Sequence, residues 1–146
     1  MNIKYKILSK DEIDGLIRKI RIYDNTELNS KIYNPRNYQE IIINKSYEYF
    51  QINEKGLLII PCGVGKTLIS LWITQELNSN TILIGVPNKL LLKQWEEVIC
   101  VLFQSVPYLI VSGGVDIETI MRFLENNKKK CIVITTYSSA HKVYTA

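Results

Sequence analysis

Residues 57–67 read Leu57-Leu58-Ile59-Ile60-Pro61-Cys62-Gly63-Val64-Gly65-Lys66-Thr67. The run at 57–60 is apolar without a break, which is typical of a strand buried on both faces of a sheet. Residues 67–77 are apolar on almost every side and predict a deeply packed helix. The sequence therefore predicts a buried strand, a tight loop and a helix in direct succession.

The loop between this strand and helix suits a phosphate. Gly63 and Gly65 lack Cβ atoms, so the backbone can curl and point its N–H groups at a common centre. The helix that begins near Lys66 adds unpaired N–H groups and a partial positive charge. The Lys66 ammonium can reach the β- and γ-phosphates of ATP, and the Thr67 hydroxyl can ligate a bridging Mg²⁺ ion. We expect Lys66 and Thr67 to be catalytic and Thr67 to hold the metal.

One position departs from the full phosphate-loop pattern, because Ile60 stands where that pattern has glycine. The alternative is a pair of turn glycines before a helix-starting lysine, which the strand–loop–helix context disfavours. Cys62 is expected to contribute only its backbone. The loop residues expected to bind the nucleotide are Cys62, Gly63, Val64, Gly65, Lys66 and Thr67.

Strands and helices alternate along the rest of the chain. Strands are predicted at 81–86, 108–111 and 131–135, and a helix at 36–50 with Tyr38, Ile42 and Tyr49 on one side. Asn88 caps a further helix. The inner residues expected there are Leu91, Trp95, Val98 and Leu102. Asp116 caps the next one. The inner residues expected there are Ile117, Ile120, Met121 and Leu124. This rhythm predicts an α/β fold with a parallel sheet and helices on both faces.

The N-terminal part differs from the rest. A helix is predicted at roughly 10–22, and residues 24–35 are polar and broken, as in a linker. We therefore expect a helical extension and linker over 1–33 and one α/β domain over 34–146.

Composition narrows the class of protein. The chain is 47% apolar and 22% charged, with a net charge of +4 that fits a nucleic-acid partner or ordinary solubility. Its three cysteines form no CxxC pair and it has one histidine, so a structural zinc site is not expected. It has no signal-peptide or membrane-spanning run. We expect an intracellular protein, cytoplasmic, nuclear or virus-associated, that is neither secreted nor membrane-bound.

Over residues 34–146 the sequence resembles the first RecA-like domain of a superfamily 2 helicase or translocase. Residues 61–67 resemble its motif I, 86–95 its motif Ia and 134–139 its motif Ic. The residues of these motifs are most similar to those of restriction-subunit-like and viral helicases. The resemblance implies a RecA-like P-loop NTPase fold that binds ATP and Mg²⁺.

Upstream of the loop, Arg36-Asn37-Tyr38-Gln39 resembles the segment with which this family contacts adenine. The resemblance nominates Gln39 to read the adenine edge, with Arg36 beside it. An amide can donate to adenine and accept from it at once. The alternative is an exposed helix glutamine.

Motifs Ia and Ic imply contacts to single- or double-stranded DNA or RNA. The residues that they nominate are Pro87, Asn88, Lys89, Thr135 and Thr136. Free N–H groups after Pro87, together with Lys89, suit a phosphate. A solvated helix face is the alternative for Lys89, and His141 is interpreted as a surface residue.

Two parts of such a motor are not found in this sequence. No acidic residue directly ends an apolar strand, as the hydrolytic Asp-Glu pair of the family does, and the second RecA-like domain is absent. We expect an incomplete sheet with an open apolar edge, little turnover, and helicase segments supplied in cis or by a completing partner. The alternatives are a P-loop nucleotide or small-molecule kinase, and a non-catalytic binding or regulatory protein.

Overall fold

The computed structural model describes residues 33–146. The chain divides into two compact units, Met1–Asn34 and Pro35–Ala146. The helix predicted at 10–22 and most of the predicted linker lie outside the described residues. The elements in chain order are α2 (Asn37–Phe50), α3 (Lys66–Glu76), β1 (Thr81–Val86), α4 (Lys89–Leu102), β2 (Tyr108–Val111), α5 (Ile117–Asn126), β3 (Cys131–Thr136), a 3-10 turn (Tyr137–Ser139) and α6 (Ala140–Thr145).

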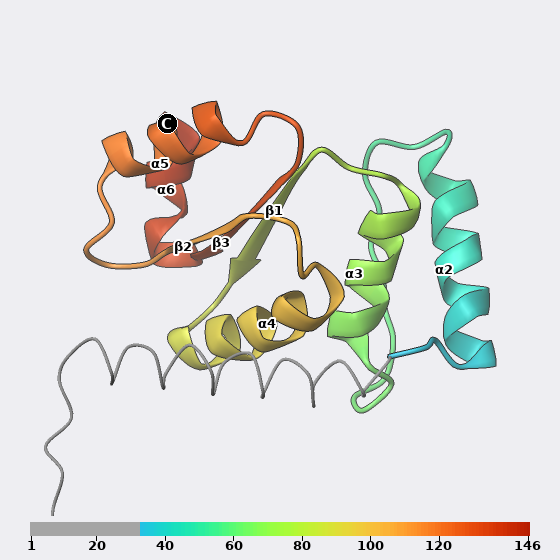
Figure 1. Ribbon diagram of the computed structural model, residues 1–146. Helices are drawn as coiled ribbons and strands as arrows, with labels where there is room; N and C mark the ends of the chain where they lie inside the picture. The colour runs from blue at the N-terminus through green and yellow to red at the C-terminus, as the bar shows by residue number, and fades with distance from the viewer. Residues whose placement is uncertain (1–32) are drawn as a thin grey trace, which may run out of the picture. The chain divides into compact units, whose positions relative to one another are not determined.

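The described residues contain one three-stranded sheet in the order β1-β3-β2. Both pairings are parallel, with Ile134 opposite Ile84 on one side and Ile110 on the other. The chain passes from β1 beyond β3 to β2 and then returns to the middle. Because parallel crossovers are right-handed, the outward and returning helices must cover opposite faces. Figure 1 shows α4 on one side of the sheet and α5 with α6 on the other. The predicted α/β class is confirmed.

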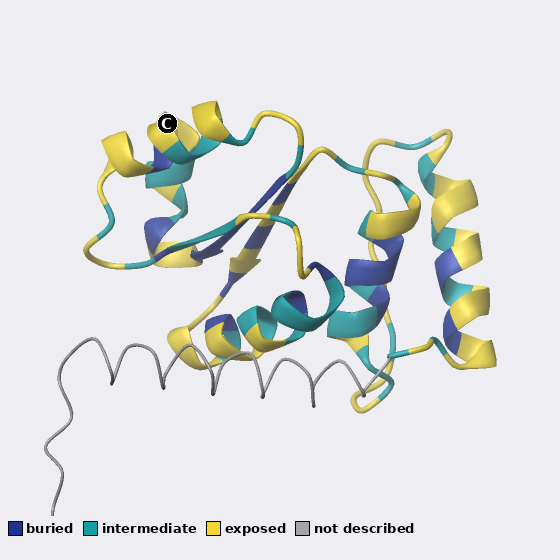
Figure 2. Ribbon diagram, in the orientation of Figure 1, coloured by how far each residue is buried: buried dark blue, intermediate teal, exposed yellow. Residues whose placement is uncertain are grey.

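The central strand joins two apolar cores. All six residues of β3 are buried, and Figure 2 shows this strand dark along its length. Ile132 and Ile134 point into the core beneath α3 and α4. Val133 points into the core beneath α5 and α6. The unbroken apolar run in β3 therefore follows from burial on both faces.

The predicted helix caps are confirmed. The Asn88 side chain accepts a 2.9 Å hydrogen bond from the N–H of Leu91, and that of Asp116 accepts a 2.7 Å bond from the N–H of Thr119. Each cap satisfies a donor that the first helical turn leaves without an intrahelical partner. These bonds fix where α4 and α5 begin.

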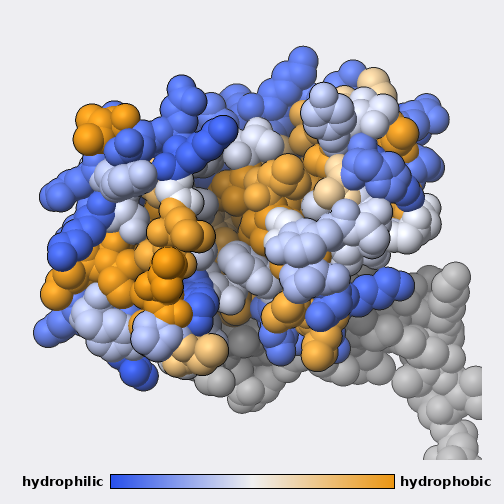
Figure 3. All heavy atoms as spheres, turned by 180° about the vertical axis from the view of Figure 1, so that it is seen from behind, coloured by the Kyte–Doolittle hydropathy of each residue, from blue (hydrophilic) through white to orange (hydrophobic). Residues whose placement is uncertain are grey.

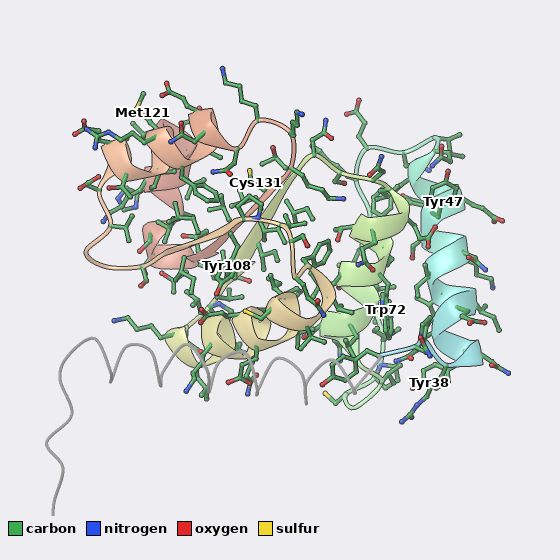
Figure 4. All side chains as sticks on the ribbon, viewed as in Figure 1. Tyr38, Tyr47, Trp72, Tyr108, Met121 and Cys131 are labelled. Atoms are coloured by element: carbon green, nitrogen blue, oxygen red, sulfur yellow. The ribbon has the colours of Figure 1, made fainter. Side chains whose placement is uncertain are left out.

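The predicted inner faces of the helices are partly wrong. On α5, Ile120 is fully buried, but Met121 is 43% exposed and points away from the sheet (Figure 4). Phe123 packs toward the core beside Ile120 and the predicted Leu124. On α4, Leu92 and Ile99 are buried. The predicted residues Leu91, Trp95, Val98 and Leu102 pack partly buried beside them.

Helix α2 also presents a different face from the one predicted. Its buried residues are Gln39 and Ile43. Tyr38 and Tyr49 are 41% and 47% exposed. The polar Gln39 is buried because it contacts the glycine loop, a role that periodicity of apolar residues cannot reveal.

The strand predicted at 57–60 is not formed. Leu57 and Ile59 are 86% and 83% exposed, and the segment pairs with no strand in the described part of the chain. It lines a cavity of about 590 Å³ together with α2 and Ile73. An extended segment becomes a strand only when a neighbour pairs with its backbone, and β1 pairs with β3 alone among residues 33–146.

Among the described residues, no helix has both the length and the apolar character that a membrane span requires.

Candidate nucleotide and nucleic-acid sites

The glycine loop has the backbone shape that its sequence predicts. Gly63 and Gly65 adopt φ values of +82° and +90°, in the left-handed region that side chains disfavour. Nothing lies within 4 Å of where a Cβ at Gly63 would stand. At Gly65 that atom would lie 2.9 Å from Nε2 of Gln39. Both glycines are thus required, one by conformation alone and the other by conformation and a close neighbour.

The helix after the loop presents an open N-terminus. Helix α3 begins at Lys66, and its N-cap Gly65 supplies no side-chain hydrogen bond. The N–H groups of its first turn therefore remain available to an anion, and the helix dipole favours negative charge there. Thr67 lies in the same first turn. These donors fit the phosphates of a nucleotide, and the Thr67 hydroxyl is a suitable ligand for Mg²⁺.

The Lys66 side chain folds over its own loop. Its Nζ donates a 2.8 Å hydrogen bond to the carbonyl oxygen of Pro61. The ammonium thus already lies at the loop, with one of its three donors engaged by this carbonyl. Cys62 in the same loop is an exposed free cysteine.

Gln39 ties the start of α2 to the loop. It is 5% exposed, so it is not the exposed helix glutamine of the alternative interpretation. Its Oε1 accepts from the backbone N–H of Arg36 at 2.8 Å, and its Nε2 donates to the carbonyl of Val64 at 2.9 Å. A carboxamide has two donors and two lone pairs, and these two bonds engage one of each.

A second site lies where β1 and β3 end. Because strands in a parallel sheet end at the same edge, the loops that follow them meet there. A groove of about 550 Å³ is formed at this edge. Its lining residues are Pro87, Asn88, Lys89, Gly113, Thr136, Ser138, Ser139, His141 and Lys142. The segments nominated from motifs Ia and Ic, about 50 positions apart, are thereby brought together.

Hydrogen bonds order the side of the groove that follows β3. The Thr136 hydroxyl lies 3.1 Å from Oγ of Ser138 and 3.2 Å from Oγ of Ser139. His141 lies with Nδ1 3.1 Å from the carbonyl of Ser138. Thr135 does not line the groove, because its side chain is 1% exposed and its hydroxyl donates to the Thr136 carbonyl. The sequence nominated both threonines, and the structure places Thr136 at the groove and Thr135 beneath it.

The sequence did not indicate the two α6 residues of the groove. His141 is exposed as expected, yet it lines the groove. Lys142 contacts the turn at Gly113 across 29 positions of sequence. The short 3-10 turn and helix that follow β3 could have nominated His141, whereas no local pattern predicts the Lys142 contact.

Comparison with known proteins identifies the family. The sequence profile described as "Type III restriction enzyme, res subunit" matches residues 32–145. The chain belongs to this family. It is also 29% identical over 105 residues to the general transcription and DNA repair factor IIH helicase/translocase subunit XPB of Enterocytozoon bieneusi (strain H348), over 70% of this chain. The matched region spans 17% of that relative's length.

Membership in the res-subunit family confirms the resemblance to superfamily 2 helicases and translocases. The parallel sheet with helices on both faces is a partial RecA-like α/β fold. The family generally implies activity that depends on ATP and Mg²⁺, and the matched relative is named as a helicase/translocase subunit. The likeness to viral helicases stays a prediction.

Proposed function

We propose that residues 34–146 form the ATP-binding front part of an ATP-dependent nucleic-acid helicase or translocase, preceded by a helical extension and linker over 1–33. The observation that supports this most is the left-handed glycine loop followed by the uncapped start of α3. Such a loop offers backbone donors and a helix dipole to a phosphate chain.

Within the nucleotide site, the loop residues 62–67 surround the phosphates, and Lys66 moves from Pro61 to the β- and γ-phosphates. Thr67 ligates Mg²⁺, which neutralises phosphate charge. Gln39 offers its remaining donor and acceptor to adenine, with Arg36 at the start of the same helix. The hydrogen bond from Gln39 to the Val64 carbonyl joins α2 and the loop into one site.

Nucleic acid, DNA or RNA, occupies the groove at the ends of β1 and β3. The uncommitted N–H groups at the start of α4 and the exposed Lys89 contact backbone phosphates, and Thr136 offers a hydroxyl. Thr135 supports Thr136 from below. The similarity to a protein named as a helicase/translocase subunit supports this assignment.

The proposed motor is completed by further helicase segments in cis or by a partner. Leu83 on β1 is 58% exposed, and the apolar segment 57–60 has no strand neighbour in the described residues. Apolar side chains gather on the side turned away in Figure 1, as Figure 3 shows. Such an area marks an interaction surface. We expect little ATP turnover by this chain alone, and an intracellular setting that suits its free cysteines.

Calorimetric titration with Mg-ATP tests the proposal. The wild-type chain should bind Mg-ATP and Lys66→Ala should not, whereas Lys93→Ala, which removes an exposed lysine of α4, should bind as wild type does. Equal affinity of the wild type and Lys66→Ala would refute the proposal. Phosphate transfer to a nucleoside monophosphate would favour a kinase. Oligonucleotide binding by both the wild type and Lys66→Ala, without ATP binding, would favour a non-catalytic regulatory protein.

A further inference from the structure

The ammonium of Lys142 holds the turn between β2 and α5. Its Nζ donates to the carbonyl oxygen of Gly113 at 2.7 Å and to that of Val115 at 2.8 Å. Two carbonyls of one turn therefore converge on one cation. Bonds from a charged donor are stronger than neutral ones, so this contact is suited to fix the turn against α6.

The two glycines of this turn have no side chains that could pack. Gly113 has a φ of +42°, nothing lies within 4 Å of a Cβ built at Gly113 or Gly114, and Val115 at the end of the turn packs against the core beneath α5 and α6. Its own backbone adds a bond of 3.3 Å from the N–H of Val115 to the carbonyl of Ser112. At the glycine part of the turn, the two bonds from Lys142 therefore supply the side-chain support.

Both ends of this contact line the groove at the ends of β1 and β3. Gly113 and Lys142 belong to its lining together with Lys89. Lys89 is exposed, whereas Lys142 is half-buried and has two of its three donors engaged. The two lysines of the groove thus differ in what their ammonium groups can do.

We propose that Lys142 is a positioning residue of the nucleic-acid groove, which sets the place of the 113–115 turn and makes no phosphate contact of its own. The inference rests on the proposed nucleic-acid function of this groove. Lys89 supplies the phosphate contact on the opposite side, while Lys142 shapes the groove that the strand enters.

The salt dependence of binding separates these two functions. A lysine that contacts a phosphate releases a counterion, so its removal lowers the slope of log K against log salt by about one. With a fluorescein-labelled single-stranded DNA, Lys89→Met should lower both affinity and slope. Lys142→Met should lower affinity several-fold with the wild-type slope, and Lys142→Arg should recover most of that affinity. A slope reduced by about one in Lys142→Met overturns the proposal.

Gly113→Ala strains the same turn without changing any charge, because its φ lies in the left-handed region. It should reproduce the loss of affinity at an unchanged slope. Wild-type affinity in Gly113→Ala would show that the place of the turn does not matter. A wild-type thermal midpoint for Lys142→Met confirms that the loss comes from the groove, and this variant can be replaced by Gly113→Ala if it fails to fold.

Hydrogen exchange provides a readout that needs no nucleic acid. Lys142→Met should speed exchange over 112–116 in the full chain, and Lys89→Met should leave it unchanged. Unchanged exchange in Lys142→Met overturns the proposal whatever the chain binds. If Lys142→Met speeds exchange but the wild-type chain binds neither the labelled DNA nor RNA of the same sequence, Lys142 positions the turn. The same result would refute the proposed nucleic-acid function.

Discussion

The ammonium of Lys66 lies 2.8 Å from the carbonyl oxygen of Pro61, five residues earlier in the same loop. This contact closes the loop on itself. Since a cation binds a phosphate more strongly than a neutral carbonyl, a triphosphate should draw the ammonium away. The Lys66 side chain therefore has one partner in the loop without nucleotide, the Pro61 carbonyl, and another when a triphosphate is bound.

Lys66→Met keeps the length of the side chain and removes its donors. We expect faster hydrogen exchange over 62–65 without nucleotide, because the bond to the Pro61 carbonyl is lost. Mg-ATP should protect this segment in the wild type and leave the variant unprotected. Lys93→Met serves as the charge-matched control. Equal protection of Lys66→Met and the wild type would contradict the assigned contact.

Gly65→Ala should be destabilising. The added Cβ would meet Nε2 of Gln39 at 2.9 Å, and alanine would have to adopt a φ of +90°. We expect a loss of about 1–3 kcal/mol in the free energy of unfolding, measured by urea denaturation. Gly114→Ala is the control, since it meets nothing within 4 Å. The prediction fails if the two variants lose the same stability.

Gln39→Ala tests the adenine contact. The wild type should prefer ATP to GTP, and loss of the carboxamide should reduce that preference by about tenfold, the worth of one net hydrogen bond. Competition with a fluorescent nucleotide gives the ratio of the two affinities. If both nucleotides bind more weakly at an unchanged ratio, Gln39 only holds the loop through its bond to the Val64 carbonyl and does not contact adenine.

Asp116 should make the stability of α5 depend on pH. The hydrogen bonds from Thr119 lower the pKa of this carboxyl below its ordinary value. Folding therefore favours the charged form, so the stabilisation is present above the ordinary carboxyl pKa and is lost as the pH falls through the lowered one.

Asp116→Asn retains an acceptor but has no charge to titrate. We expect its stability to fall less steeply than that of the wild type below about pH 4, as followed by circular dichroism. Asp116→Ala should be less stable at neutral pH, because the cap is lost. Identical acid unfolding of Asp116→Asn and the wild type would rule out this contribution.

Leu83→Lys should reduce self-association. Leu83 is 58% exposed on the strand that pairs on one side only in residues 33–146, so a charge there should oppose edge-to-edge contact at little cost to folding. Sedimentation velocity over a range of concentrations measures the effect. Leu90→Lys replaces a leucine of α4 that is 70% exposed and should have no such effect. Similar association of both variants would argue against the β1 edge.

Local signals predicted most of the fold. The run at 81–86 forms β1 at those residues, and the caps at Asn88 and Asp116 form as expected, because each depends on neighbours within a few positions. The glycine loop was predicted for the same reason. Its shape needs only glycines and a following helix.

Distant contacts explain what the sequence did not reveal. Residues 57–60 have the composition of a strand but no partner among the described residues, and pairing is not encoded within four positions. The burial of Gln39 depends on Val64, 25 positions later. The contact of Lys142 with the Gly113 turn joins residues 29 positions apart. Contacts between residues so far apart in sequence can be predicted only once the arrangement of the helices and strands in space is known.

The groove at the strand ends takes its two sides from opposite layers of the sheet. Pro87 to Lys89 lead into α4, which packs on one face, and Ser138 to Lys142 lead into α6, which packs on the other. The fully buried β3 lies between them. A displacement of α4 relative to α6 would therefore change the distance between the two sides of the groove.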